Sequence, residues 1–206
     1  MVIGTEPMSQ DELARAHGYA LLSQLFRAPP GADLLGLYSP PPVDPDVKFT
    51  LHQIELRGRD AAVQSFQDAC LLHTASEVAE EYEALFGSLR NSLASPAPSS
   101  LLAALREHLR ACGLAPSGTL GGVEFYVSGV CDVLCWLIEH DRPLNVQAAF
   151  FNEFVDTGVI GVCDAIDTAK EARFYRAVAS LARSFIEDER ATLDVGGEDS
   201  AGKLQK

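Results

Sequence analysis

The sequence predicts an all-α fold, a single-domain helical bundle. Apolar residues recur at helical spacing along most of the chain, and no turn signal lies between two alternating runs, as a β-hairpin would require. With 206 residues, 47% of them hydrophobic and 22% charged, the chain has the length and composition of one ordinary globular domain. We expect a disordered N-terminus over residues 1–8, a helical domain over 9–191 and a disordered C-terminal tail over 192–206.

The first predicted helix begins after Ser9 and runs to about Arg27. Ser9 and Glu12 have the spacing of a capping box, in which the hydroxyl and the carboxylate each pair with a backbone N–H of the first turn. Pro29 and Pro30 end the helix, because proline lacks a backbone donor and clashes with the preceding turn.

Shorter helices are expected in the middle of the chain. Gly87 and Gly113 follow two of them and are expected to end them. Residues 91–100 are rich in Ser, Ala and Pro and are expected to form a loop, and residues 117–122, with three glycines, a flexible hinge. The helical segments themselves are expected over residues 33–38, 49–57, 60–74, 76–86 and 101–112.

The C-terminal part is predicted to hold three longer helices. Residues 123–139 are strongly apolar and are expected to form a central helix, and Pro143 is expected in the first turn of the next one, which runs to about Cys163. Thr168 and Glu171 have capping-box spacing before the last helix. One buried stripe of that helix is expected to contain Phe174, Val178, Leu181 and Phe185.

The charge and the cysteine content restrict the possible partners. A net charge of −13 argues against nucleic acid and favours a basic partner, unless the charge serves solubility alone. No run of 18 apolar residues is present, so we expect no stable membrane insertion. The odd number of cysteines, five, and the absence of a signal-like start predict a cytoplasmic protein with reduced thiols.

The sequence offers few candidates for catalysis. No glycine pattern matches a phosphate-binding loop, and the histidines lack metal-binding spacing. Cys131 and Cys135 are more typical of small buried apolar residues than of ligands, and Glu77, Glu80 and Glu81 of a solvated helix face than of an acid/base pair. We therefore expect a protein that is not an enzyme and has no cofactor or metal site.

Several segments, in order along the chain, resemble the motifs of one protein family. Residues 81–87, EYEALFG, followed by Pro96 and Ser99, resemble a YxxLFxG…PxxS segment. The family is that of TorD/DmsD-type, NarJ-related chaperones of redox enzyme maturation. Its usual Asp-His pair before the central helix is replaced here by residues 120–126, LGGVEFY, so no role of that pair is carried over. Other stretches that resemble the family's helices are residues 19–30, 105–114, and 150–154 with 174–179.

The resemblance implies a cytoplasmic chaperone for an apo-molybdoenzyme. Such a protein binds the catalytic subunit, its twin-arginine signal peptide, or both, and assists molybdopterin insertion and proofreading before export. The alternative is a helical scaffold or regulatory binding module with no signal-peptide role. A monomer and a domain-swapped dimer, exchanged through the hinge at residues 117–122, are both compatible with the sequence.

A receptor for such a peptide needs an apolar groove with acidic residues at its rim. Glu81, Glu83, Glu124 and Asp132 are candidates to bind the arginines by charge-assisted hydrogen bonds. For the aromatic candidates Phe125, Tyr126 and Trp136, core packing is favoured over groove binding. The predicted peptide-binding residues are Tyr82, Leu85, Phe86, Pro96, Ser99, Glu124, Phe125, Tyr126, Asp132 and Trp136.

Overall fold

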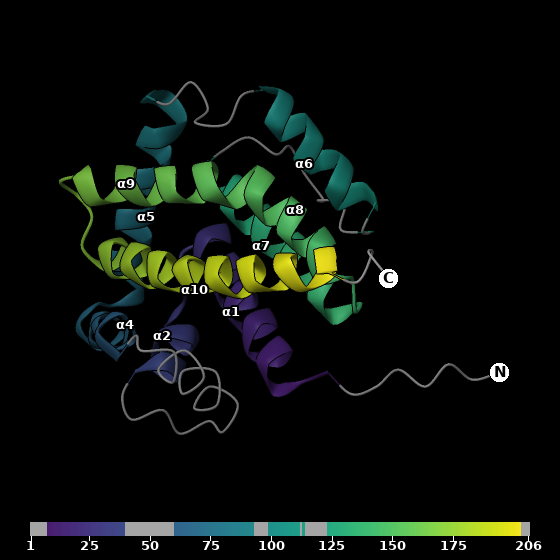
Figure 1. Cartoon of the computed structure of the whole chain (residues 1–206). Helices are drawn as coiled ribbons and strands as arrows, with labels where there is room; N and C mark the ends of the chain where they lie inside the picture. The colour runs from purple at the N-terminus through teal and green to yellow at the C-terminus, as the bar shows by residue number, and fades with distance from the viewer. Residues whose placement is uncertain (1–7, 40–59, 93–98, 112, 114–122, 203–206) are drawn as a thin grey trace.

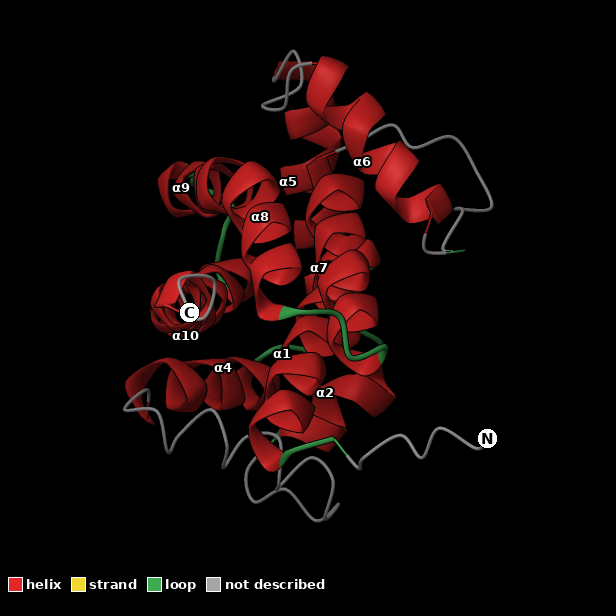
Figure 2. Ribbon diagram, turned by 45° about the vertical axis from the view of Figure 1, so that its right-hand side comes forward, coloured by secondary structure: helices red, strands yellow, loops and turns green. Residues whose placement is uncertain are grey.

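A computed structural model describes residues 8–39, 60–92, 99–111, 113 and 123–202, and every regular element among them is a helix (Figures 1 and 2). The predicted all-α, single-domain bundle is confirmed. The predicted helix at 49–57 and the predicted hinge at 117–122 lie outside the described residues. The elements are α1 (Gln10–Arg27), α2 (Ala32–Tyr38), α4 (Asp60–Leu72), α5 (Ala75–Ser92), α6 (Ser99–Ala111), α7 (Val123–Glu139), α8 (Leu144–Phe154), the π-helical turn η1 (Val155–Val159), α9 (Ile160–Thr168) and α10 (Phe174–Gly202).

Two helix pairings organise the bundle. α1 and α7 pack against each other more extensively than any other two helices. α10 crosses in front of them in Figure 1 and packs against α4, α8 and α9. Buried apolar side chains from all the helices form one continuous core. None of the described helices has the length and the apolar run that crossing a bilayer requires.

The ends of several helices follow the sequence signals. Glu12 N–H donates to Ser9 Oγ at 3.2 Å and Ser9 N–H donates to the Glu12 carboxylate at 2.9 Å, so the predicted capping box is confirmed. Gly113 has a φ of +73° just after α6, as expected for the residue that ends a helix. Gly87, by contrast, does not end α5, which continues to Ser92.

The last helix differs from its prediction at both ends. Its stripe of Phe174, Val178, Leu181 and Phe185 is buried, as predicted. The predicted Thr168–Glu171 capping box is wrong, because Thr168 ends α9 and its hydroxyl donates back to the Ala165 carbonyl at 3.0 Å. α10 also extends to Gly202, beyond residue 192 where the sequence predicts a disordered tail. Leu193 adds one more buried position, because it follows Glu189 at helical spacing.

The predicted helix between Pro143 and Cys163 is interrupted by the π turn η1. Just before η1, the Tyr126 hydroxyl of α7 donates to the Phe154 carbonyl. The Tyr126 ring lies directly against Gly158, where a Cβ atom would collide with it. A π turn inserts one extra residue into a helix and disturbs its regular hydrogen bonds. Here it accommodates a bulky side chain from a neighbouring helix.

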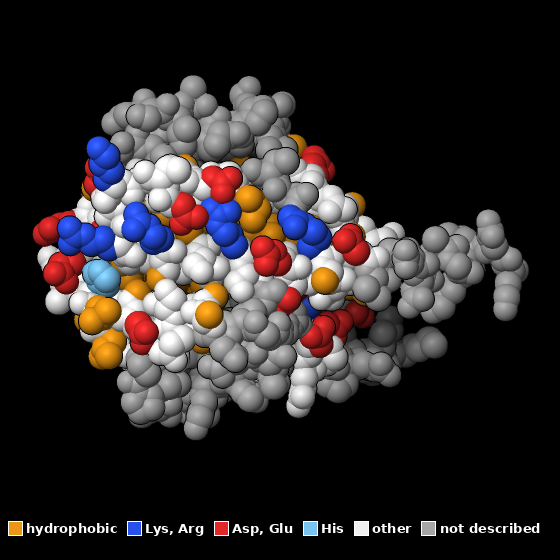
Figure 3. All heavy atoms as spheres, turned by 60° about the vertical axis from the view of Figure 1, so that its left-hand side comes forward, with side chains coloured by type: hydrophobic (Ala, Val, Ile, Leu, Met, Phe, Trp, Pro, Cys, Tyr) orange, Lys and Arg blue, Asp and Glu red, His pale blue; other side chains and the backbone are white. Residues whose placement is uncertain are grey.

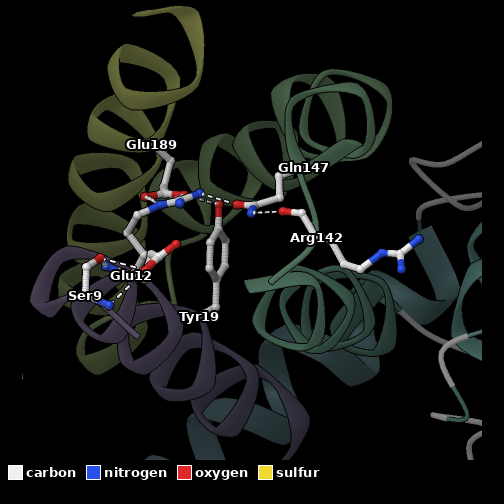
Figure 4. A network of polar contacts seen from close by, with 7 residues as sticks. Ser9, Glu12, Tyr19, Arg142, Gln147 and Glu189 are labelled. Carbon is white, nitrogen blue, oxygen red and sulfur yellow. Dashed lines mark hydrogen bonds and ion pairs between the residues drawn. The ribbon is translucent and has the colours of Figure 1, made fainter. Parts of the chain in front are cut away.

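A buried polar network joins α1, α8 and α10 (Figure 4). Arg15 Nε donates to Glu189 Oε1 at 2.8 Å, and Tyr19 OH donates to Glu189 Oε2 at 3.0 Å. Arg15 Nη2 donates to Gln147 Oε1 at 2.8 Å, and Gln147 Nε2 donates to the Arg142 carbonyl at 2.7 Å. Because the side chains of Arg15 and Glu189 are only 1% and 0% exposed, each charge depends on these partners inside the protein.

Candidate functional site

Four of the predicted peptide-binding residues belong to the core. Tyr82, Leu85, Phe86 and Tyr126 are at most 4% exposed. Both phenol groups form hydrogen bonds inside the protein: Tyr82 OH donates to the Arg27 carbonyl at 3.0 Å, and Tyr126 OH donates to the Phe154 carbonyl at the end of α8. In the folded protein these side chains therefore stabilise the bundle and do not belong to a surface that a guest peptide can reach.

The Glu81 carboxylate also forms its hydrogen bonds inside the protein, although the sequence predicts it on a solvated helix face. Glu81 is only 8% exposed, so that expectation is wrong. Its carboxylate accepts hydrogen bonds from the backbone N–H groups of Arg173, Phe174 and Tyr175, at 2.9, 3.0 and 2.8 Å. These donors have no partner within α10, because the first N–H groups of a helix never do. Glu81 of α5 therefore caps α10 and is not available to a guest arginine.

For some of the other predicted residues, the side chain, or the whole residue, lies outside what the structure describes. Pro96 lies outside the described residues. Ser99 opens α6, and Glu124 and Phe125 lie in the first turn of α7, with side chains outside the described part. Glu83, named among the acidic candidates, is exposed on α5. Asp132 and Trp136 remain, and the structure brings these two together.

Asp132 and Trp136 line a hollow of about 390 Å³ between α1 and α7, here called the α1–α7 groove. Each helix contributes residues at positions i, i+3, i+4 and i+7, which is the spacing of one helix face. The groove is lined from α1 by Ala20, Ser23, Gln24 and Arg27, and from α7 by Asp132, Cys135, Trp136 and Glu139.

Three side chains form a polar cluster in the groove. Ser23 Oγ donates to Asp132 Oδ1 at 2.6 Å, and Arg27 Nη2 donates to Ser23 Oγ at 2.9 Å. The same Arg27 nitrogen forms an ion pair with Asp132 Oδ2. The Arg27 and Asp132 side chains are 55% and 30% exposed, so this ion pair lies at the surface. The sequence did not indicate Ser23 or Arg27, because both belong to a helix 105 or more residues away from Asp132.

Trp136 is half-buried, and its ring forms one wall of the groove. One face stacks on the His140 ring, with centroids 4.2 Å apart and an interplanar angle of 19°. The sequence favours core packing over groove binding for this residue. Its partial exposure makes it accessible to a guest, which the buried Tyr126 is not.

Two carboxylates follow one another along the α7 side of the groove. Asp132 and Glu139 are seven residues apart, which is about 10 Å along a helix that rises 1.5 Å per residue. Trp136 lies between them in the sequence and on the same face. The groove therefore presents a row of acid, indole and acid, a combination that suits a cationic guest with apolar parts.

The groove's cysteine is not suited to nucleophilic chemistry. Burial, together with the nearby Glu139 carboxylate, raises the pKa of the Cys135 thiol to about 12. Since the thiolate is the reactive form, Cys135 is held in its unreactive state at neutral pH. Among the described residues, no three His, Cys, Asp or Glu side chains lie together as metal ligands.

The face formed by α9, α10 and the end of α4 is a different kind of surface (Figure 3). Basic and acidic side chains alternate across it, and Arg183 of α10 pairs with Asp164 and Asp167 of α9 at 2.7 and 2.8 Å. Leu71 and Leu72, the most exposed large apolar side chains of the described part, end α4. The α1–α7 groove differs from this face because it combines two carboxylates with a half-buried indole, so it is the better candidate for a cationic guest.

Comparisons of the chain with protein-family models, with curated proteins and with solved structures found no match. The resemblance to TorD/DmsD-type chaperones therefore depends on the sequence motifs alone.

Proposed function

We propose that this protein is a cytoplasmic chaperone for an apo-molybdoenzyme. It binds the catalytic subunit, its twin-arginine signal peptide, or both, and assists molybdopterin insertion and proofreading before export. The family-like motifs support the choice of client. The observation that carries the proposal is the acid, indole and acid row of Asp132, Trp136 and Glu139 in the α1–α7 groove.

A twin-arginine peptide has chemistry that complements this row. Two neighbouring arginines can reach carboxylates about 10 Å apart, because each side chain is long and flexible. A guanidinium donates charge-assisted hydrogen bonds to a carboxylate, and it also stacks on aromatic rings such as the half-buried indole of Trp136. The apolar stretch that follows the arginines in a signal peptide would continue along the groove walls, where Ala20 and the methylenes of Gln24 lie.

Binding of this kind is reversible and depends on salt. The groove is open to solvent at Glu139 and at Arg27, so its charges are screened by added ions. We therefore expect the affinity for a twin-arginine peptide to fall as ionic strength rises. A guest held by exposed charges is released without any covalent step, as a chaperone that hands over its client requires.

The direct test is a titration of the protein with a synthetic twin-arginine signal peptide, in which isothermal titration calorimetry measures the affinity. The double variant Asp132→Asn/Glu139→Gln should bind about tenfold more weakly at low salt, since two charge-assisted contacts lose strength. Replacing both peptide arginines by lysine should also weaken binding. The matched control, Glu83→Gln/Glu187→Gln, removes the same charge from exposed positions outside the groove and should bind as the unmodified protein does.

Affinity capture from cells that make a candidate molybdoenzyme tests the client. The proposal expects the apo-enzyme to be recovered. A double groove variant that binds the peptide with unchanged affinity would contradict the proposed site. Stoichiometric recovery of a partner without a molybdopterin domain would favour the scaffold or regulatory module instead.

A further inference from the structure

We propose that Asp132, Ser23 and Trp136 form a guanidinium-binding pocket, which Arg27 of the same chain occupies until an arginine of the guest replaces it. Arg27 is thus a resident competitor for the guest. The inference builds on the proposed function, which supplies the guest, and it adds the element that sets affinity and selectivity.

The contacts of Arg27 show what the pocket recognises. One nitrogen of its guanidinium donates to Ser23 Oγ at 2.9 Å and pairs with Asp132 Oδ2. Ser23 is itself buried, at 4% exposed, and its hydroxyl donates to Asp132 Oδ1 at 2.6 Å. That bond fixes the orientation of the carboxylate, so the acceptors for a cation are in place before any guest arrives.

The resident arginine is held weakly enough to be exchanged. Its side chain is 55% exposed, and ion pairs at exposed positions contribute little net free energy because water and salt compete for both charges. A guest that contacts Asp132 can also contact Trp136 and Glu139, which line the same groove. Once a guest has made one contact, its next contact forms within the same complex and costs less entropy. A guest that makes several contacts therefore outcompetes a single resident side chain.

The pocket should prefer arginine to lysine. A planar guanidinium can lie flat against the indole of Trp136 while its edge donates to Asp132 and Ser23. An ammonium group is a compact, strongly hydrated charge and cannot make both kinds of contact in the same way.

The test uses L-arginine amide as the probe and the fluorescence of Trp136, the only tryptophan of the chain, as the signal. Arg27→Met keeps a long apolar side chain and removes the charge. We expect it to bind L-arginine amide roughly fivefold more tightly than the unmodified protein, because no resident cation competes. Introducing Asp132→Asn into the Arg27→Met protein should abolish the gain, and lysine amide should bind more weakly than arginine amide.

Arg183→Met is the matched control, since Arg183 also pairs with carboxylates but lies outside the groove. It should leave the affinity unchanged. If Arg27→Met binds arginine amide no better than the unmodified protein, Arg27 does not compete and the inference fails. Equal binding of lysine amide would contradict the guanidinium pocket. These measurements use only amino-acid amides and no client protein. A failure of this inference can therefore be distinguished from a failure of the signal-peptide titration.

Discussion

Helix α1 carries two arginines that pair with carboxylates, one near each end, and the two pairs differ in almost every property. Arg15 and Glu189 are 1% and 0% exposed and share their network with Tyr19 and Gln147 (Figure 4). Arg27 is 55% exposed, and its partner Asp132 belongs to an open groove. The buried arginine–carboxylate pair therefore fixes the positions of α1, α8 and α10, whereas the exposed pair at the other end of α1 can exchange its partners.

The comparison shows that the surroundings of an ion pair decide its role. A buried charge needs every hydrogen bond around it, because the protein interior does not solvate it. A charge at the surface exchanges its partner for water or for a guest at little cost. The contrast between Glu81 and Asp132 follows the same rule. Glu81 accepts from three backbone N–H groups at the start of α10, whereas Asp132 accepts from a hydroxyl and an exposed guanidinium.

Breaking the buried pair should have the largest effect on stability. Glu189→Gln leaves the Arg15 charge in the interior without its counter-charge, so we expect the free energy of unfolding to fall by about 3–5 kcal/mol. Urea denaturation followed by circular dichroism measures the change. A loss below about 1 kcal/mol would mean that the two arginine pairs of α1 do not differ as proposed.

Removing the cap of α10 should come next. Glu81→Ala leaves three N–H groups at the start of α10 without acceptors, two of them buried and one part-buried, which should lower the free energy of unfolding by about 2–3 kcal/mol. Glu83→Ala, two residues away and exposed, is the matched control and should change stability by less than about 0.5 kcal/mol. Equal effects of the two substitutions in thermal or urea unfolding would show that Glu81 does not cap α10.

The π turn supplies a third, smaller effect. Gly158→Ala places a methyl group against the buried Tyr126 ring, whose hydroxyl is fixed by its bond to Phe154, so we expect a loss of about 1–3 kcal/mol. Gly161→Ala, where a Cβ atom meets nothing within 4 Å, should instead stabilise the helix by roughly 0.5–1 kcal/mol. Thermal unfolding of the two variants measures these changes in stability. Changes of opposite sign would confirm that the Tyr126 ring packs against Gly158 in the core, and changes of the same sign would contradict it.

The surface pair should have the smallest effect on stability. Asp132→Asn weakens one exposed ion pair, so the free energy of unfolding should change by no more than about 1 kcal/mol. The same substitution should weaken binding of a twin-arginine peptide, measured by calorimetry. A large loss of stability together with unchanged binding would reverse the roles assigned to the two ends of α1.

Three occurrences of one local motif show how far the sequence predicts the fold. Ser9–Glu12 was predicted to cap α1 and does. Thr168–Glu171 was predicted to cap the last helix and does not, because Glu81 supplies that cap from a distant helix. The third pair, Thr74 and Glu77, is not among the predicted helix caps. Thr74 N–H donates to the Glu77 carboxylate at 2.8 Å, and Glu77 N–H donates to Thr74 Oγ1 at 3.3 Å, just before α5. Local patterns predict helices well, whereas long-range contacts decide how some of them begin.

The candidate site shows the same limit. Asp132 and Trp136 are four residues apart on one helix, so the sequence could place them on a common face. Ser23 and Arg27 could not be added, because nothing in the sequence says that α1 packs against α7. Tyr82, Leu85 and Phe86 were assigned to binding through the family-like motif, but they are buried with the rest of the apolar core.

Photo-crosslinking tests the central claim, that a guest peptide binds in the α1–α7 groove, most directly. A twin-arginine peptide carrying a benzophenone side chain next to its arginines would be irradiated with the full chain, and the adducts located by mass spectrometry. The account predicts adducts within residues 20–27 of α1 and within residues 132–140, at the end of α7 and directly after it. Specific adducts confined to other parts of the chain, such as the end of α4 around Leu71 and Leu72, would contradict it.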